Sequence, residues 1–382
     1  MRTITLLQPS KLAFGTGCWR ECVPYIKGKQ LQSVQILYTQ ALADEASQLQ
    51  ALLASEGITA TQTIAPRGEP TIEIFEELLE RSRAVRPDCV LGIGGGSVLD
   101  LAKLLAAFLY SEQYVRDCFG IGLVSTRKCH LICIPTTSGT GSEVSPNAIL
   151  LDVAEQLKKG IVSEFLVADA AYIDPELTVR LPADITAFTG LDALTHCIEA
   201  YTNKFAHPLI DVYALEGVRL ISQHIAIAIQ HGDNLVAREA LSLGSMLGGL
   251  CLGPVNTAAV HALAYPLGGE FHLAHGLSNA ILLAEVFAFN AQANPEHHAD
   301  IAIALGCSAA SNPMETALLG AERLRALTDS CGVQRNLAAY GVGREQVPSM
   351  AQSAAKVTRL LKNNPRDLTV QMIEEIYLNC FE

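Results

Sequence analysis

The first half of the chain alternates short apolar runs with segments of helical periodicity. Mostly apolar stretches predict buried strands at 34–39, 89–93 and 131–134. Between them, the segments 41–55 and 70–85 carry apolar residues at the spacing of one helix face. Strands that alternate with helices in this way predict an α/β domain built on an open parallel sheet with helices on both faces.

The pattern changes in the second half. From about residue 187 the chain shows long helical segments, such as 209–230 and 235–250, and no convincing strand. We therefore predict two domains: an α/β nucleotide-binding domain over residues 1–186 and an all-helical domain over residues 187–382.

Composition limits the class of protein. The chain has 382 residues, of which 49% are hydrophobic and 17% charged, enough for two substantial cores. Its 27 Lys and Arg against 39 Asp and Glu give a net charge of −12, and no basic run is present, so nucleic acid is not an expected partner. No signal peptide is apparent, and we expect no apolar run long enough to cross a bilayer.

Cysteine usage points to a reducing compartment. The eleven cysteines are an odd number, and no Cys-x-x-Cys pair occurs among them. Scattered cysteines of this kind suit a reducing cytosol better than a disulfide framework. We therefore expect a cytoplasmic protein that does not engage a membrane.

Two loops rich in glycine and hydroxyl groups follow predicted strands. In Gly92-Ile93-Gly94-Gly95-Gly96-Ser97, backbone amides can approach a pyrophosphate while the following helix offers its positive end. Ser97 and Asp100 also predict a capping box. An ordinary strand-to-helix turn explains this loop equally, since Ser97 occupies the last glycine position of the usual dinucleotide fingerprint. The second loop, at 135–143, also lies at the end of a strand, where open sheets place ligands.

Four polar residues stand in apolar or glycine-rich stretches. Asp192 and His196 lie four apart, so on a helix they point from one face. His261 and His275 lie further along the chain, and His275 is expected to open a helix after a turn. One carboxylate and three imidazoles suit Fe²⁺ or Zn²⁺. A lone Asp-x-x-x-His is more often a surface pair, but burying several ionisable groups without a partner is costly, which favours a metal site here.

Taken together, these motifs match a known family. They are Gly94-Gly95-Gly96-Ser97-x-x-Asp100-x-x-Lys103, Pro135 to Glu143, Asp174-Pro175-Glu176-Leu177, Thr189-Gly190-x-Asp192-Ala193-x-x-His196, and His261 to His275. The combination resembles the iron-containing, or group III, alcohol dehydrogenases over nearly the whole chain. The resemblance implies a dehydroquinate synthase-like architecture and an enzyme that interconverts a small alcohol and its aldehyde or ketone by hydride transfer with NAD or NADP.

The resemblance also implies site residues. The metal ligands that it implies are Asp192, His196, His261 and His275, holding Fe²⁺ or Zn²⁺. The cofactor contacts that it implies are Gly95, Gly96, Ser97, Asp100, Thr136, Thr137, Thr140, Ser145 and Lys158, although a single Lys such as Lys158 is also at home on solvated surface. His272 resembles a family histidine near the site that relays a proton, and a loop hydrogen bond explains it equally well. Tyr265 is expected to line the substrate pocket.

The chain departs from its relatives at two positions near the expected cofactor. Gln40 stands where many relatives carry an Asp that holds a ribose hydroxyl and repels a 2′-phosphate, so NAD and NADP both stay open. Glu69 replaces a common Asn.

Several alternatives remain. A maleylacetate-type reductase is the nearest rival. A dehydroquinate-synthase-like lyase requires a basic pocket, and the stretch from His261 to His275 holds no Lys or Arg. A non-catalytic nucleotide-binding module does not need four converging ligands. We expect a homo-oligomer, specifically a dimer, and the natural alcohol, the native metal and the physiological direction are left open.

Overall fold

The computed structural model describes residues 2–155 and 157–381. The chain forms two compact units, and each is considered by itself. The sheet unit consists of Leu6–Thr137 and Gly141–Thr178, and the helical unit consists mainly of the chain from Val179 onward together with Ser138–Thr140. Helix α5 (Ala183–Thr202) runs across the boundary predicted between residues 186 and 187, whereas the units divide before that helix begins.

The sheet unit is built on six parallel strands. Their order is β1 (Lys11–Phe14), β9 (Ala170–Ile173), β6 (His130–Pro135), β4 (Cys89–Gly94), β2 (Ser33–Tyr38) and β3 (Thr59–Ile64). A smaller sheet has the order β5 (Gly120–Ile121), β8 (Leu157–Val162) and β7 (Asn147–Asp152), with β7 antiparallel to β8. The predicted open parallel sheet is confirmed.

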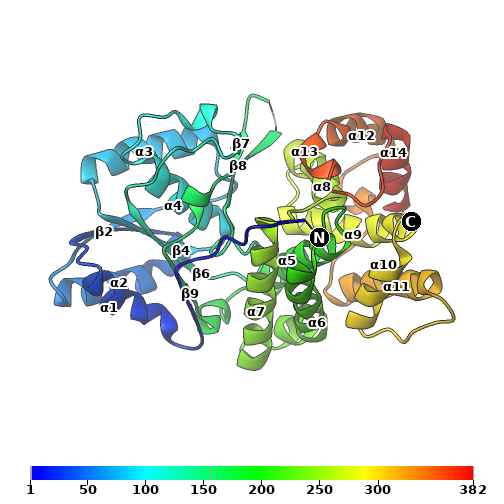
Figure 1. The fold of residues 1–382 in the computed structure, drawn as a ribbon, viewed down its shortest axis with the longest axis horizontal. Helices are drawn as coiled ribbons and strands as arrows, with labels where there is room; N and C mark the ends of the chain where they lie inside the picture. Colours follow the sequence, from blue (N-terminus) through cyan, green and yellow to red (C-terminus); the bar gives the residue numbers. More distant parts are fainter. Residues whose placement is uncertain (1, 156, 382) are drawn as a thin grey trace. The chain divides into compact units, whose positions relative to one another are not determined.

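Helices cover both faces of the larger sheet (Figure 1). They are α1 (Cys22–Gly28), α2 (Ala43–Ser55), α3 (Ile72–Val85) and α4 (Gly96–Phe108). The unit also contains the 3-10 turns η1 (Cys18–Glu21), η2 (Gln40–Leu42), η3 (Val115–Asp117), η4 (Glu164–Leu166) and η5 (Pro175–Thr178). Side chains of β2 alternate between two hydrophobic cores. Ile36 and Tyr38 belong to the core beneath α1 and α2, and Leu37 belongs to the core beneath α3 and α4. This alternation is the period-2 pattern of a strand buried on both faces.

Strand order determines where a ligand can bind. From β2 the chain adds β3 on one side, and it then adds β4, β6 and β9 on the other side. Between β2 and β4 the direction of winding reverses, and open α/β sheets bind ligands outside the carboxyl ends of the strands at such a point. The residues that follow β2, β4 and β6 are Gln40, the loop 95–97 and the loop 136–143, which are the predicted nucleotide-binding segments.

In the part of the chain that the structure describes, the helical unit contains α-helices and short 3-10 turns. These are α5, α6 (Pro208–Gln230), α7 (Leu235–Leu252), α8 (Ala259–Phe271), α9 (His275–Ala291), α10 (Pro295–Ala304), α11 (Pro313–Ser330), η6 (Leu337–Tyr340), η7 (Arg344–Gln346), α12 (Val347–Ala355), α13 (Thr358–Leu361) and α14 (Val370–Asn379). Helix α5 is central to the unit, because α6, α7 and α9 all pack against it. The predicted change from alternating elements to long helices is confirmed.

Glycines allow neighbouring helices to approach α5 closely. A Cβ on Gly276, at the start of α9, would lie 2.1 Å from the carbonyl oxygen of Phe188 on α5. A Cβ on Gly217 of α6 would lie 2.4 Å from the Sγ atom of Cys197 on α5. Since any other residue requires the helices to separate, these glycines set the distance of α6 and α9 from α5.

The expectation that no apolar run is long enough to cross a bilayer is wrong. By length and composition, α6 and α7 both meet that requirement. However, 78% of the apolar window of α7 is buried inside the protein, and α6 packs against α5 and α7. Helix α6 also carries an exposed ion pair between Glu216 and Arg219. We interpret both as helices of the packed unit, because the core helix of a large domain has the same composition as a membrane span.

Replacing Gly217 with Ala is predicted to destabilise the protein. The Cys197 side chain is fully buried, its sulfur lies 3.8 Å from the carbonyl oxygen of Gly244, and the added Cβ would also lie 3.3 Å from that oxygen, so there is little space for the contact to relax. Overpacking of this kind costs about 1–3 kcal/mol. The matched control is Gly28→Ala in α1, where nothing lies within 4 Å of an added Cβ. Urea unfolding should show a loss for Gly217→Ala only, and equal midpoints for the two variants would contradict the packing argument.

Candidate metal centre and nucleotide-binding loops

The four predicted metal ligands come together in the helical unit. Asp192 and His196 lie on α5, one turn apart, while His261 lies on α8 and His275 is the first residue of α9. The Oδ1 atom of Asp192 is 3.8 Å from His196 Nε2, 3.5 Å from His261 Nε2 and 3.8 Å from His275 Nε2. Candidate ligand atoms of Asp192, His261 and His275 all lie within 4.8 Å of one another.

This arrangement fits a divalent metal ion. Ligand atoms placed tetrahedrally at about 2.1 Å from an ion are separated by about 3.4 Å, close to the distances between Asp192 and the three rings. Asp192, His196 and His261 are buried, and His275 is partly exposed. The donor set of one carboxylate and three imidazoles suits Fe²⁺ and Zn²⁺ alike.

Electrostatics at the centre favour a bound cation. Burial by itself raises the pKa of the Asp192 carboxyl, but His196, His275 and His261 outweigh burial, and the pKa falls below its ordinary value. Burial lowers the pKa of His196, which keeps this ring neutral, as a metal ligand requires. Burial also acts to lower the pKa of His261, but Glu199 and Asp192 outweigh it and raise that pKa to about 9. The two carboxylates therefore stabilise positive charge where the ring nitrogens converge.

Two residues that the sequence argument missed support these ligands. Glu199, on α5 and 4% exposed, accepts a hydrogen bond from the backbone N–H of Val260 at 2.6 Å and lies 2.6 Å from His261 Nδ1. A carboxylate on Nδ1 fixes the tautomer that leaves Nε2 free to bind a metal. Asn279, one turn after His275, donates from Nδ2 to Asp192 Oδ1 at 2.7 Å. A detectable signal existed for both, because each is a polar residue on an apolar helix at helical spacing from a ligand.

His272 lies at the C-terminal cap of α8. Its backbone is left-handed, with φ of 56°, and its side chain is exposed. The backbone N–H of His272 bonds to the carbonyl oxygen of Leu267, whereas the imidazole forms no hydrogen bond with any residue that the structure describes. Among the described residues, the His272 ring therefore does not form the loop hydrogen bond that was considered as its alternative role.

The two predicted nucleotide-binding loops touch each other in the sheet unit. Helix α4 begins at Gly96, directly after β4, and the first N–H groups of a helix lack intrahelical acceptors. A Cβ on Gly95 would lie 3.2 Å from Cγ2 of Thr137, so a larger residue would require the Thr137 side chain to shift. Thr137 is partly exposed, and Thr136 before it is buried.

The capping box predicted for Ser97 and Asp100 is wrong. Gly95 is the N-cap of α4, and no side chain caps the helix. The carboxylate of Asp100 instead accepts from Ser142 Oγ at 2.5 Å and from the backbone N–H of Ile149 at 2.9 Å. Donors from distant segments thus satisfy both carboxylate oxygens.

A buried lysine that the sequence argument did not assign anchors the second loop. Lys103 Nζ donates to the carbonyl oxygen of Asn147 at 2.7 Å and to Ser145 Oγ at 3.3 Å, and it lies 3.9 Å from Asp100 Oδ1. Burial lowers the pKa of Lys103 and raises that of Asp100. Ser145, Asp100 and Lys103 therefore form an internal network that joins α4 to the segment leading into β7.

The remaining predicted cofactor contacts lie on different segments. Gln40 is exposed and is the first residue of η2, two residues after the end of β2. Thr140, Gly96 and Ser97 are partly exposed. Lys158 lies on β8, and its ammonium forms an ion pair with Glu69 at 2.8 Å. Glu69, the residue that departs from a common Asn, thus pairs with Lys158, the lysine expected to reach the cofactor.

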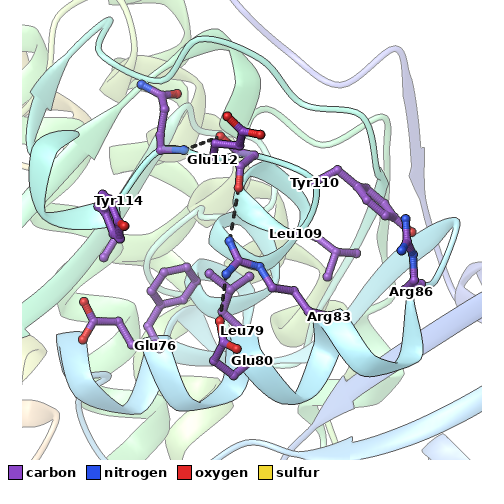
Figure 2. A pocket seen from close by; sticks show the side chains of 13 residues that line it. Glu76, Leu79, Glu80, Arg83, Arg86, Leu109, Tyr110, Glu112 and Tyr114 are labelled. Carbon is purple, nitrogen blue, oxygen red and sulfur yellow. Dashed lines mark hydrogen bonds and ion pairs between the residues drawn. The ribbon is translucent and has the colours of Figure 1, made fainter.

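One pocket, of about 750 Å³, lies elsewhere in the sheet unit. Figure 2 shows Arg83, Glu80 and Tyr110 among its lining side chains, which come from α3, the end of α4 and residues 111–115. Arg83 is engaged, since it bonds to Glu80 and to the carbonyl oxygen of Ser111. The pocket is at the opposite end of α4 from Gly96, about 20 Å away by the rise of the helix. None of the predicted site residues lines it.

Comparison with known proteins identifies the family of the chain. The family described as "Iron-containing alcohol dehydrogenase" matches residues 9–175, and "Fe-containing alcohol dehydrogenase family, C-terminal" matches residues 186–381. Long-chain-alcohol dehydrogenase 1 of Geobacillus thermodenitrificans is 35% identical over 100% of this chain and 98% of its own length.

Solved structures share the fold. A crystal structure of a 1,3-propanediol oxidoreductase has a TM-score of 0.95 and 30% identity, covering 100% of both chains. The sulfoacetaldehyde reductase of Bifidobacterium kashiwanohense, solved in complex with NAD⁺, has a TM-score of 0.90 and 25% identity, covering 100% of this chain and 99% of its own. Since the family matches extend across both units, the chain belongs to the iron-containing alcohol dehydrogenase family of oxidoreductases.

Proposed function

We propose that this oxidoreductase interconverts a small alcohol and its aldehyde or ketone, with hydride passing between the substrate carbon and NAD or NADP. Asp192, His196, His261 and His275 hold Fe²⁺ in this proposal. The observation that supports it most strongly is the convergence of three imidazole Nε2 atoms on one carboxylate oxygen of a buried residue. When bound, the metal supplies a Lewis acid that polarises the carbonyl oxygen.

Other residues orient the metal ligands and transfer the proton. Glu199 keeps the His261 ring in one orientation and tautomer, and Asn279 keeps the Asp192 carboxylate turned toward the three rings. His272 moves the proton that the alcohol oxygen gains or loses. Intrinsic affinity favours Zn²⁺ over Fe²⁺ at such a site, so the native metal is set by supply as well as by ligands.

In this proposal, the two loops that follow β4 and β6 bind the cofactor, together with Lys158 of β8. The backbone of Gly95, Gly96 and Ser97 approaches the pyrophosphate at the start of α4, and Thr136, Thr137, Thr140 and Lys158 contribute side-chain contacts. Asp100 contributes by accepting a hydrogen bond from Ser142 of the second loop, and Ser145 contributes by binding Lys103 just after that loop. The enzyme works in the cytoplasm as a homodimer in this proposal, and its eleven free thiols suit a reducing compartment.

The rival activities are less consistent with the site. A lyase acting on a phosphorylated sugar acid requires cationic side chains beside the metal, and the segment from His261 to His275 holds none. A maleylacetate-type reductase usually departs from the pattern from Thr136 to Glu143 that this chain retains.

Replacing Glu199 with Gln is predicted to weaken Fe²⁺ binding about 10- to 100-fold, the usual effect of removing a residue that orients a ligand. His261→Ala removes a ligand and should weaken binding further. The control is Glu216→Gln, which alters an exposed ion pair on α6. Anaerobic titration against a competing chelator measures all three, and wild-type affinity in Glu199→Gln would show that the carboxylate does not act on the ligand.

Replacing His272 with Asn is predicted to lower turnover and change its pH dependence, while Fe²⁺ stays bound. Asn tolerates the left-handed backbone at this position, so the imidazole is removed without added strain. Loss of a positioned proton donor typically costs about 10²- to 10⁴-fold. Steady-state rates across pH, with metal analysis of the same samples, decide the matter. An unchanged pH profile would assign His272 no part in proton transfer.

Replacing Gln40 with Asp is predicted to shift cofactor preference toward NADH. An added carboxylate after β2 accepts from the ribose hydroxyls of NADH and repels the 2′-phosphate of NADPH. The expected change in discrimination is about 1.5–3 kcal/mol, the scale of hydrogen bonds to charged groups. Gln48→Asp, which adds the same charge at an exposed position on α2, is the control. If the ratio of kcat/KM for NADH and NADPH stays constant in Gln40→Asp, this position does not contact the ribose.

A further inference from the structure

Arg359 of the helical unit has no anionic partner among the residues that the structure describes. Arg359, on α13, is half-buried, and its guanidinium forms one hydrogen bond, from Nη2 to the hydroxyl oxygen of Tyr265 at 3.5 Å. No carboxylate in the described ranges 2–155 and 157–381 pairs with it. By contrast, the partly buried Arg325 forms a bidentate ion pair with Glu285, at 2.8 and 2.9 Å. A half-buried cation with five N–H donors and one long hydrogen bond to a neutral group retains unused capacity for an anion.

Tyr265 links Arg359 to the metal centre. It follows the ligand His261 by four residues on α8, so the two side chains share a helix face with Cβ atoms about 5–6 Å apart. Tyr265 is 9% exposed, and the Arg359 guanidinium contacts its hydroxyl group. Through Tyr265, Arg359 is therefore connected to the face of α8 that carries a metal ligand.

We propose that Arg359, together with the hydroxyl group of Tyr265, binds an anionic group at the far end of the substrate. This inference rests on the proposed alcohol dehydrogenase function and defines its substrate class as short aldehydes or hydroxy compounds that carry a carboxylate or a sulfonate. A guanidinium binds either group through two parallel charged hydrogen bonds. A wholly apolar chain would leave the cation unpaired.

The test compares charged and neutral aldehydes of similar length. Initial rates are measured for 4-oxobutanoate, sulfoacetaldehyde and butanal with wild type, Arg359→Gln and Arg359→Lys. In the wild type, kcat/KM should be higher for at least one anionic aldehyde than for butanal. Arg359→Gln should lower kcat/KM for the anionic aldehydes on the order of 10- to 100-fold, mainly through KM, and leave butanal unchanged. Arg359→Lys should recover part of the loss because it restores the charge.

A matched control is available on α11. Arg323 has one hydrogen bond, to the carbonyl oxygen of Leu305, and no ion pair among the described residues. Arg323→Gln removes the same charge away from the metal ligands and should leave all three aldehydes unaffected. If Arg359→Gln keeps the wild-type ratio between anionic and neutral aldehydes, the inference is overturned.

Binding separates this inference from the proposed function. Calorimetric titration of the Fe²⁺-loaded protein with 4-hydroxybutanoate requires no turnover. If binding is lost in Arg359→Gln and kept in Arg323→Gln, the result supports the anion site. It does so even if no aldehyde is reduced, because a lack of reduction contradicts only the proposed activity. If both variants bind 4-hydroxybutanoate equally, the anion site is overturned. In that case, reduction of butanal by Arg359→Gln would still support the proposed activity.

Discussion

The helical unit depends on keeping the Asp192 carboxylate ionised in a buried position. A buried carboxylate is costly without compensation, and here three imidazoles and the Asn279 amide surround its Oδ1 atom. These partners come from α5, α8 and α9, so the compensation exists only when the three helices are correctly packed. The close approach at Gly276, which brings the start of α9 against α5, therefore also positions His275 as a ligand.

In the sheet unit, a different constraint positions the chemistry. The parallel arrangement sends the carboxyl ends of β2, β4 and β6 to one edge, and the winding reverses between β2 and β4. Backbone amides at the start of α4 supply positive potential there. The buried Lys103 acts at a distance from this edge, because it holds the second loop through Ser145 and the carbonyl oxygen of Asn147.

Sequence patterns predicted what depends on local periodicity. The buried strands β2, β4 and β6, the long helices and the spacing of Asp192 and His196 follow from local patterns, and the structure has them. The strands β1, β3 and β9 of the same sheet were not predicted. The strands β7 and β8 were missed because the hairpin is only partly buried and carries lysines. The capping box at Ser97 failed because Asp100 is satisfied by Ser142 and Ile149, which are distant in sequence. The partners in such long-range hydrogen bonds cannot be read from the sequence; the helical spacing of Glu199 marks it as a candidate, but not its bond with His261.

We propose that a divalent metal held by α5, α8 and α9 stabilises this group of helices. Hydrogen exchange of the wild-type protein with and without Fe²⁺ tests this stabilisation, since a ligand that binds only the folded site slows local opening there. We expect slower amide exchange around Asp192, His196, His261 and His275, and unchanged exchange in the six strands of the larger sheet. Exchange that does not respond to Fe²⁺, or that slows only outside these helices, would contradict it.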